Sequence, residues 1–171
     1  MAATVTWAEQ NGAATGTPAA GTETTVTTCD WKSTDSATAT RASAPVTAGN
    51  NSFTKYLYAK FAGTFNQISN VKFAHTAGTL GTGISLKSKI TSTYSTPSAT
   101  AMSDGTDITA TTAIASGATV LLGATPNDAS PAASKTSACT TQYIVTQVQT
   151  TSSAAAGDSG TATLTVQYNE N

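Results

Sequence analysis

The chain has 171 residues, a net charge of −1, and a composition in which 37 threonines, 31 alanines and 18 serines make up half of all residues. This length suits one ordinary domain, and the eight basic residues are too scattered for the phosphate contacts of a nucleic-acid-binding protein. No apolar run approaches the roughly 18 residues that a membrane-spanning helix needs. Threonine is β-branched and suits a pleated surface, so the composition favours an ordered β protein over a disordered chain.

Apolar and polar residues alternate with a period of two along much of the chain, which is typical of strands. In the N-terminal part this alternation predicts strands over residues 4–10 and 24–28. Residues 11–22 are rich in glycine, alanine and threonine, and they are predicted to be a loop. The whole segment 1–22 could then form an extended N-terminal arm. A Gly-Asn-Asn run marks residues 45–52 as a turn.

The strongest predicted strand, residues 53–61, has bulky residues on both of its faces. One face carries Phe53, Lys55, Leu57, Ala59 and Phe61, and the other carries Thr54, Tyr56, Tyr58 and Lys60. This pattern predicts that the strand is covered on both sides or lies at an interface. Val71, Phe73 and His75 alternate along the next strand.

A glycine-rich segment, residues 77–83, is predicted to be a hairpin connection, because it lacks the Gly-Lys-Ser/Thr of a phosphate-binding loop. A strand over residues 84–90 follows. Residues 108–115 and 118–122 are predicted to form a hairpin, and residues 123–137 a long surface loop.

The C-terminal part shows the clearest alternation. It predicts strands over residues 141–150 and 161–168, joined by a loop of small residues at 152–160. In the last strand, Ala162, Leu164, Val166 and Tyr168 alternate with Thr161, Thr163, Thr165 and Gln167. One face is therefore expected to lie in the core, and the threonine side to face water or a partner.

About eight to ten strands and no helix predict an all-β protein. We expect residues 1–171 to form one antiparallel β-sandwich of jelly-roll-like topology. The core is thin, since valine, isoleucine, leucine and phenylalanine together number only 24. Such a domain is expected to gain stability from neighbours in an oligomer or lattice.

Little in the sequence points to chemistry. The single histidine, His75, continues a core face and is expected to be structural, because no metal ligands or catalytic partners accompany it. Asp104 and Asp107 are expected to lie in a turn. Cys29 and Cys139 are expected to be small buried residues, with a disulfide as the alternative. The sequence predicts no enzymatic activity, no cofactor and no metal.

Aromatic residues are the more informative candidates. We expect Trp31, Phe53, Leu57 and Phe61 to lie in the core. Trp7, Tyr56 and Tyr58 are the candidate interface residues, with burial in the core as the alternative for each. Residues 1–10 are expected to contact another subunit, because Trp7 on a short terminal strand would otherwise be poorly anchored.

Several stretches resemble small virion proteins of tailed bacteriophages, especially capsid decoration (cement) proteins. They are residues 4–12, 48–57, 61–65, 68–73, 143–154 and 163–168, which include the segments Thr-Val-Thr-Trp-Ala-Glu-Gln-Asn-Gly and Thr-Leu-Thr-Val-Gln-Tyr. The resemblance implies a β-rich module that binds the major capsid protein on the capsid exterior, often as a homotrimer, and joins adjacent capsomers. It assigns no role to individual residues.

Two other functions also fit the sequence. One is a different virion component of the tail, baseplate, neck or head fibre. The other is a β-sandwich that binds a carbohydrate or receptor, with Trp7, Trp31, Tyr56 or Tyr58 stacking on sugars. The N-terminus has neither a basic start nor an apolar segment, so no secretory signal is expected. We expect instead that the chain is made in the host bacterial cytoplasm and that it does not bind a membrane.

Overall fold

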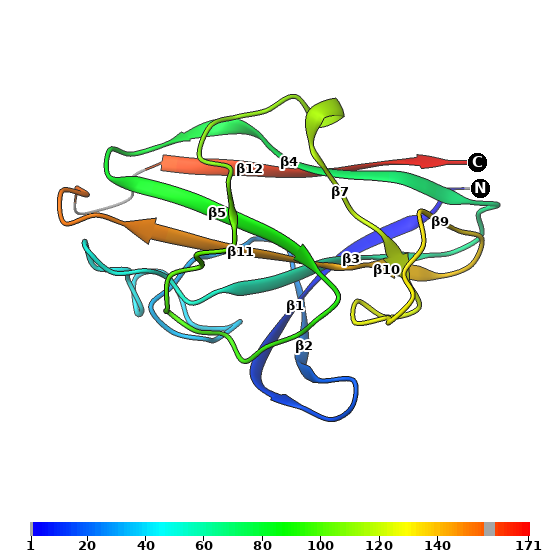
Figure 1. Ribbon diagram of the computed structural model, residues 1–171, viewed down its shortest axis with the longest axis horizontal. Helices are drawn as coiled ribbons and strands as arrows, with labels where there is room; N and C mark the ends of the chain where they lie inside the picture. The colour runs from blue at the N-terminus through cyan, green and yellow to red at the C-terminus, as the bar shows by residue number, and fades with distance from the viewer. Residues whose placement is uncertain (1, 156–159) are drawn as a thin grey trace.

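The structure is a computed structural model that describes residues 2–155 and 160–171. Two antiparallel sheets face each other in two layers, and the N- and C-termini lie side by side at one end (Figure 1). This arrangement confirms the predicted all-β, antiparallel sandwich. A jelly-roll topology is not confirmed.

The first sheet contains eight strands. Its main path runs β2 (Ala20–Val26), β1 (Thr4–Thr15), β3 (Lys55–Ala62), β11 (Tyr143–Thr150), β5 (Ile84–Thr91) and β6 (Thr106–Asp107). Beside this path, β10 (Cys139–Thr141) pairs with β3, and β8 (Leu122–Gly123) pairs with β10.

The second sheet contains four strands. Its order is β12 (Gly160–Glu170), β4 (Ile68–Leu80) and β7 (Ala118–Thr119), with β9 (Ser134–Lys135) also pairing with β4. The short 3-10 helix η1 (Ile114–Ser116) precedes β7. The strands predicted at 53–61, 84–90, 141–150 and 161–168 are confirmed, with small shifts of their ends.

The predicted loop at residues 11–22, and with it the N-terminal arm at 1–22, is wrong. Strand β1 continues to Thr15, β2 begins at Ala20, and β1 lies between β2 and β3. The hydroxyl of Tyr94 donates to the Gly12 carbonyl at 2.8 Å, and Ala14 N–H donates to Thr96 Oγ1 at 2.9 Å. Backbone pairing and these contacts with distant residues hold segment 11–22 in the sheet. Its small side chains do not alternate between apolar and polar, so the sequence gave no strand signal.

The predicted hairpin of residues 108–115 and 118–122 is also wrong. Residues 114–116 form η1, and Ala118 and Thr119 pair with Phe73 and Lys72 of β4. Residues 122–123 belong to β8, in the other sheet. The glycine-rich segment does connect β4 to β5, as predicted, although β4 extends to Leu80. The predicted loop at 152–160 lies partly outside the described residues.

Two apolar clusters cover the two faces of the first sheet. The cluster between the sheets comprises Ala59, Phe61, Ile68, Val71, Phe73, Val120, Leu122, Cys139 and Ile144. The cluster on the opposite face comprises Ala8, Tyr56, Tyr58, Tyr94, Met102, Tyr143 and Val145, where Tyr94 and Met102 come from the segment 92–105 that follows β5. The β3 strand is therefore covered on both sides, as its sequence predicts.

Candidate functional site

Tyr56 and Tyr58, two of the three predicted interface residues, lie in the core. Their exposed fractions are 8% and 1%. The Tyr56 ring packs edge-on against Tyr94, with the ring centroids 4.7 Å apart, and both Tyr56 and Tyr58 contact Tyr143. The Tyr58 hydroxyl donates a hydrogen bond to Glu23, and burial is the main cause that raises the pKa of Tyr58. The interface prediction is wrong for these two residues, because segment 92–105 covers their face of the sheet.

Trp7, the third predicted interface residue, is half-buried and packs against the inter-sheet cluster. Its neighbours in the sheet are Val26 on β2 and Ala59 on β3, so it is anchored within its own chain. Nearby, Ala3 N–H donates to Glu170 Oε1 at 2.8 Å, which ties the two ends of the chain together. A contact of residues 1–10 with another subunit stays a prediction.

A buried ion pair joins β1 and β3 of the first sheet. Lys55 Nζ lies 2.6 Å from Glu9 Oε1, and the two residues are 1% and 2% exposed. Asn11 Nδ2 donates to the same carboxylate oxygen at 2.6 Å, and it also donates to Asp35 Oδ1 at 2.7 Å. With so little exposure, the charges of Glu9 and Lys55 are shielded from solvent, and their pairing links β1 to β3.

Segment 27–54 lies near this ion pair. Trp31 Nε1 joins the segment to β11 by donating to Thr146 Oγ1 at 3.1 Å, and within the segment the buried Lys32 Nζ donates to the Ala39 carbonyl at 2.7 Å. Burial lowers the pKa of Lys32, and the nearby Lys55 charge adds to this effect. Alternation in the sequence could not show this ion pair, because its two residues come from strands that are far apart in the sequence.

Both thiols are free, so the predicted disulfide alternative is not formed. Cys139 is buried, and Cys29 is half-buried. Loss of water around the sulfur raises the pKa of Cys29 to about 12, and the same effect raises the pKa of Cys139. At neutral pH neither thiol is a thiolate, which is the form that a nucleophile requires.

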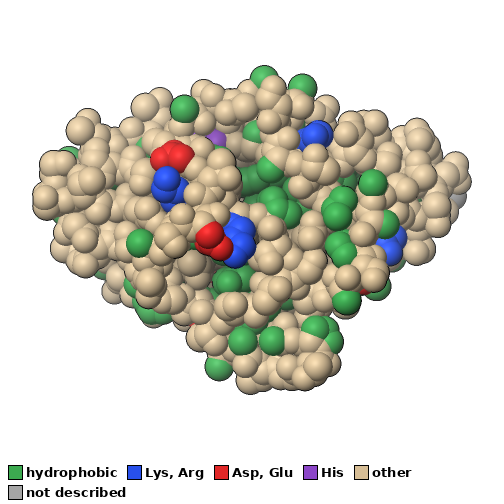
Figure 2. Space-filling view, viewed as in Figure 1, with side chains coloured by type: hydrophobic (Ala, Val, Ile, Leu, Met, Phe, Trp, Pro, Cys, Tyr) green, Lys and Arg blue, Asp and Glu red, His purple; other side chains and the backbone are tan. Residues whose placement is uncertain are grey.

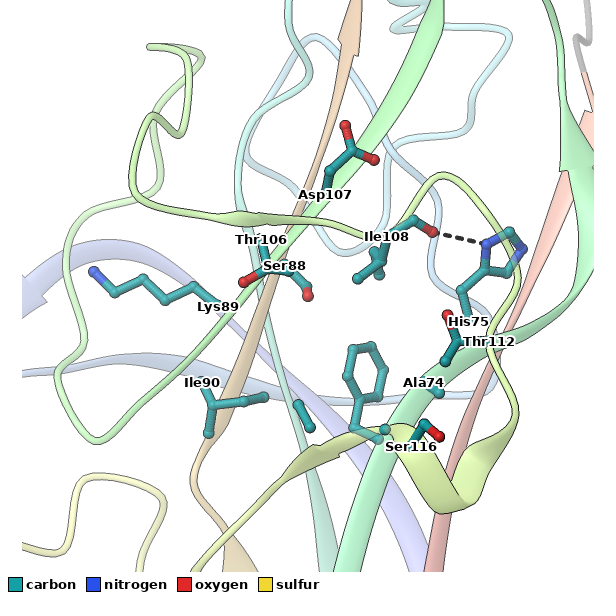
Figure 3. Close-up of a pocket in the computed structure, with 13 residues that line it drawn as sticks. Ala74, His75, Ser88, Lys89, Ile90, Thr106, Asp107, Ile108, Thr112 and Ser116 are labelled. Carbon is teal, nitrogen blue, oxygen red and sulfur yellow. Dashed lines mark hydrogen bonds between the residues drawn. The ribbon is translucent and has the colours of Figure 1, made fainter.

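A cleft of about 210 Å³ lies between β4 and β5 (Figure 3). Phe73, Ile90 and Ile108 give it an apolar lining, and His75 lies at one end. His75 is 1% exposed, with Nδ1 2.9 Å from the Ile108 carbonyl oxygen and Nε2 2.8 Å from that of Ala77. Both ring nitrogens are engaged by backbone, as expected for a structural histidine, and the ring offers no free group to a ligand.

Asp107, at the rim of this cleft, is expected to make stability sensitive to acid. Its carboxylate accepts a hydrogen bond from Thr109 N–H at 2.9 Å and lies 3.0 Å from Lys87 Nζ, and these contacts lower its pKa from 3.8 to about 2. A carboxylate whose pKa is lowered by folding stabilises the fold at pH values above its pKa in the unfolded chain. It loses this effect as the pH falls through its pKa in the folded chain. The thermal midpoint of Asp107→Asn should therefore lie below that of the parent chain at about pH 6 and converge with it by about pH 2. A constant difference across this range would contradict the assignment.

The outer side of the second sheet carries a row of threonines. We define the threonine face as Thr76, Thr79, Thr161, Thr163 and Thr165, of which Thr79 and Thr161 pair across β4 and β12. The hydroxyls of Thr76 and Thr165 lie 2.6 Å apart. Leu164, Val166 and Tyr168 project from β12 toward the inter-sheet cluster. The predicted division of this strand into an apolar and a threonine side is confirmed.

Charges are sparse on the molecule's surface. Figure 2 shows one side, where charged side chains are few, and its acidic side chains lie beside basic ones. Within residues 2–155 and 160–171, no group of three or more metal-ligating side chains comes together. None of the described helices has the length and hydrophobicity required to span a bilayer.

Compared with family models, curated proteins and solved structures, the chain matches none.

Proposed function

We propose that this chain is a structural protein of a tailed-phage virion, which binds the major capsid protein on the capsid exterior and stabilises contacts between capsomers. The observation that carries the proposal is the threonine face, a row of five threonines on the outer side of a two-layer scaffold. The resemblance of the sequence to decoration proteins agrees with it. The proposal requires no catalytic residue.

A surface of threonines fits a repeating protein lattice. Threonine has little side-chain freedom to lose on contact, and its hydroxyl and methyl groups suit both polar and apolar neighbours. Each contact is weak, but a lattice offers many identical positions, and a linked set of weak contacts gives high overall affinity. The sparse charge keeps the cost of desolvation at such a contact low.

The carbohydrate-binding alternative loses its main residues. Tyr56 and Tyr58 are buried and cannot stack on a sugar. Trp31 is half-buried, and its indole N–H is bonded to Thr146. Trp7 is also half-buried, so none of these four aromatic residues is fully exposed.

Sedimentation with capsids tests the proposal. The purified chain is mixed with capsids assembled from the major capsid protein encoded in the same genome, and the bound fraction is measured in the pellet. We expect saturable binding that Thr79→Arg weakens at least about tenfold, a change equivalent to 1.4 kcal/mol. The matched control is Thr25→Arg, at an exposed threonine on β2, which should bind as the parent does.

Two outcomes would overturn the proposal. If the parent chain stays in the supernatant at every concentration, it does not bind capsids. If labelled chain is found on tails, baseplates or necks of intact virions and not on capsids, the chain is a different virion component.

A further inference from the structure

Strand β12 has a free edge. Among the described residues, β12 pairs only with β4, so one side of an 11-residue strand has no partner. The other sheet margins are blunted: β6, β7, β8 and β9 have two residues each. The β2 margin has seven residues and carries Glu23, which is bonded to Tyr58 and Lys60.

The free edge of β12 is also regular. The pairing register with β4 shifts between Thr163 and Leu164, and again between Gln167 and Asn169. At both places the extra residue belongs to β4, as Thr76 does at the first. Bulges protect an edge by bending the strand that contains them. Here the bulged strand is the inner one, so the outer strand keeps an unbroken edge.

Natural proteins usually protect a long edge with lysine, proline or an inward charge. Residues 160–169 contain no charged residue and no proline. The apolar side chains of this strand, Leu164, Val166 and Tyr168, are only half-buried although they contact the core. An unprotected edge with incompletely covered apolar residues is typical of a strand that pairs with another chain.

We propose that β12 pairs with β12 of a second copy of this chain, antiparallel and about a two-fold axis. The pairing extends the second sheet across both copies and does not depend on capsid binding. It forms a dimer, in contrast to the homotrimer that the sequence resemblance implies.

The edge is complementary to itself. The register that pairs every residue of β12 places Thr165 on the axis, opposite its own copy. It sets Thr163 opposite Gln167, and it sets Leu164 opposite Val166. Polar residues then meet polar residues on the outer face, while apolar residues cover one another on the core face. No like charges meet along residues 160–169.

The backbone groups that would form these hydrogen bonds can be identified. Asn171 N–H donates to the Gln67 carbonyl at 3.0 Å, and the Thr163 carbonyl accepts from Thr76 Oγ1 at 3.4 Å, so odd-numbered residues of β12 turn their backbone groups toward β4. Because backbone N–H and C=O groups alternate in direction along a strand, those of the even-numbered residues point to the free edge. They include Ala162, Leu164, Val166 and Tyr168.

Light scattering and hydrogen exchange on the purified full chain test this pairing. The mass should rise with concentration from 17.1 kDa toward twice that value. As it rises, the amides of Ala162, Leu164, Val166 and Tyr168 should become at least about tenfold slower to exchange. Amides of β2, on the opposite margin, should not change.

Two variants separate pairing from folding. Thr163→Lys adds a charge at the edge, and Ala162→Pro removes one outward N–H without removing a donor to β4. Both should remain monomeric at concentrations where the parent is a dimer, and Thr25→Lys on β2 should dimerise normally. A parent chain that is monomeric throughout would overturn the proposal. So would a trimer, or a dimer that both edge variants leave intact.

Discussion

Replacing Lys55 by methionine is expected to destabilise the chain by about 3–5 kcal/mol. The substitution leaves the Glu9 carboxylate at 2% exposure without the ammonium group that lies 2.6 Å away. Asn11 Nδ2 would remain as a neutral donor, but it cannot balance the buried charge. The free energy of unfolding, measured by urea titration at neutral pH, gives the result directly.

A second ion pair on the same strand is the control. Lys60 lies 2.5 Å from Glu23, with the two side chains 40% and 42% exposed. Solvent screens such a pair, so Lys60→Met should cost less than about 1 kcal/mol. The double variant Glu9→Gln/Lys55→Met should recover much of the loss caused by Lys55→Met, because no charge is then left buried. A loss below about 1 kcal/mol for Lys55→Met alone would show that water reaches Glu9.

Alternation predicted those strands whose side chains divide cleanly between two environments. In β12 the even-numbered residues contact the inter-sheet cluster and the odd-numbered ones carry the threonines. In β3 both faces are bulky, and both are covered. A local pattern is sufficient in these cases, because it reflects burial on one face or on two.

The sequence could not show features that depend on distant segments. Glu9 and Lys55 are 46 residues apart, and although Lys55 lies in a strand predicted to be covered on both faces, nothing local shows that the two residues pair. For Tyr56 and Tyr58 the sequence could not decide between an interface and the core, because the segment that covers them, residues 92–105, has no periodic pattern of its own. The β1–β2 hairpin was missed for a related reason: alanine, glycine and threonine pair through their backbone without an apolar signal.

The same limits apply to the candidate site. The threonine side of β12 could be predicted, since it lies in one short segment. The free edge beside it could not, because an edge is defined by the absence of a neighbouring strand among residues far away in sequence. That the bulges belong to β4 and leave β12 straight is likewise a property of the register between two strands.

Tyr143 is expected to be as important to stability as a residue between the sheets. It is 0% exposed and contacts the rings of Tyr56, Tyr58 and Tyr94, with centroids 5.5, 5.8 and 5.8 Å away. Replacing it by alanine removes a large ring from a packed cluster and should cost about 3–5 kcal/mol. Denaturant titration of Tyr143→Ala beside Phe61→Ala, from the inter-sheet cluster, tests whether the two clusters contribute equally.

The conservative variant separates packing from hydrogen bonding. The Tyr143 hydroxyl donates to Gln10 Oε1 at 2.7 Å, and burial raises the pKa of this hydroxyl to about 12, so it remains a donor at neutral pH. In Tyr143→Phe, Gln10 Oε1 still accepts from Gly21 N–H at 3.1 Å, so the loss should be only about 1 kcal/mol. If Tyr143→Phe lowers the free energy of unfolding as much as Tyr143→Ala does, the cluster around Tyr143 is held by its polar contacts and not by ring packing. Among the described residues, the inter-sheet cluster would then be the main apolar source of stability, which would strengthen the case for the proposed pairing along β12.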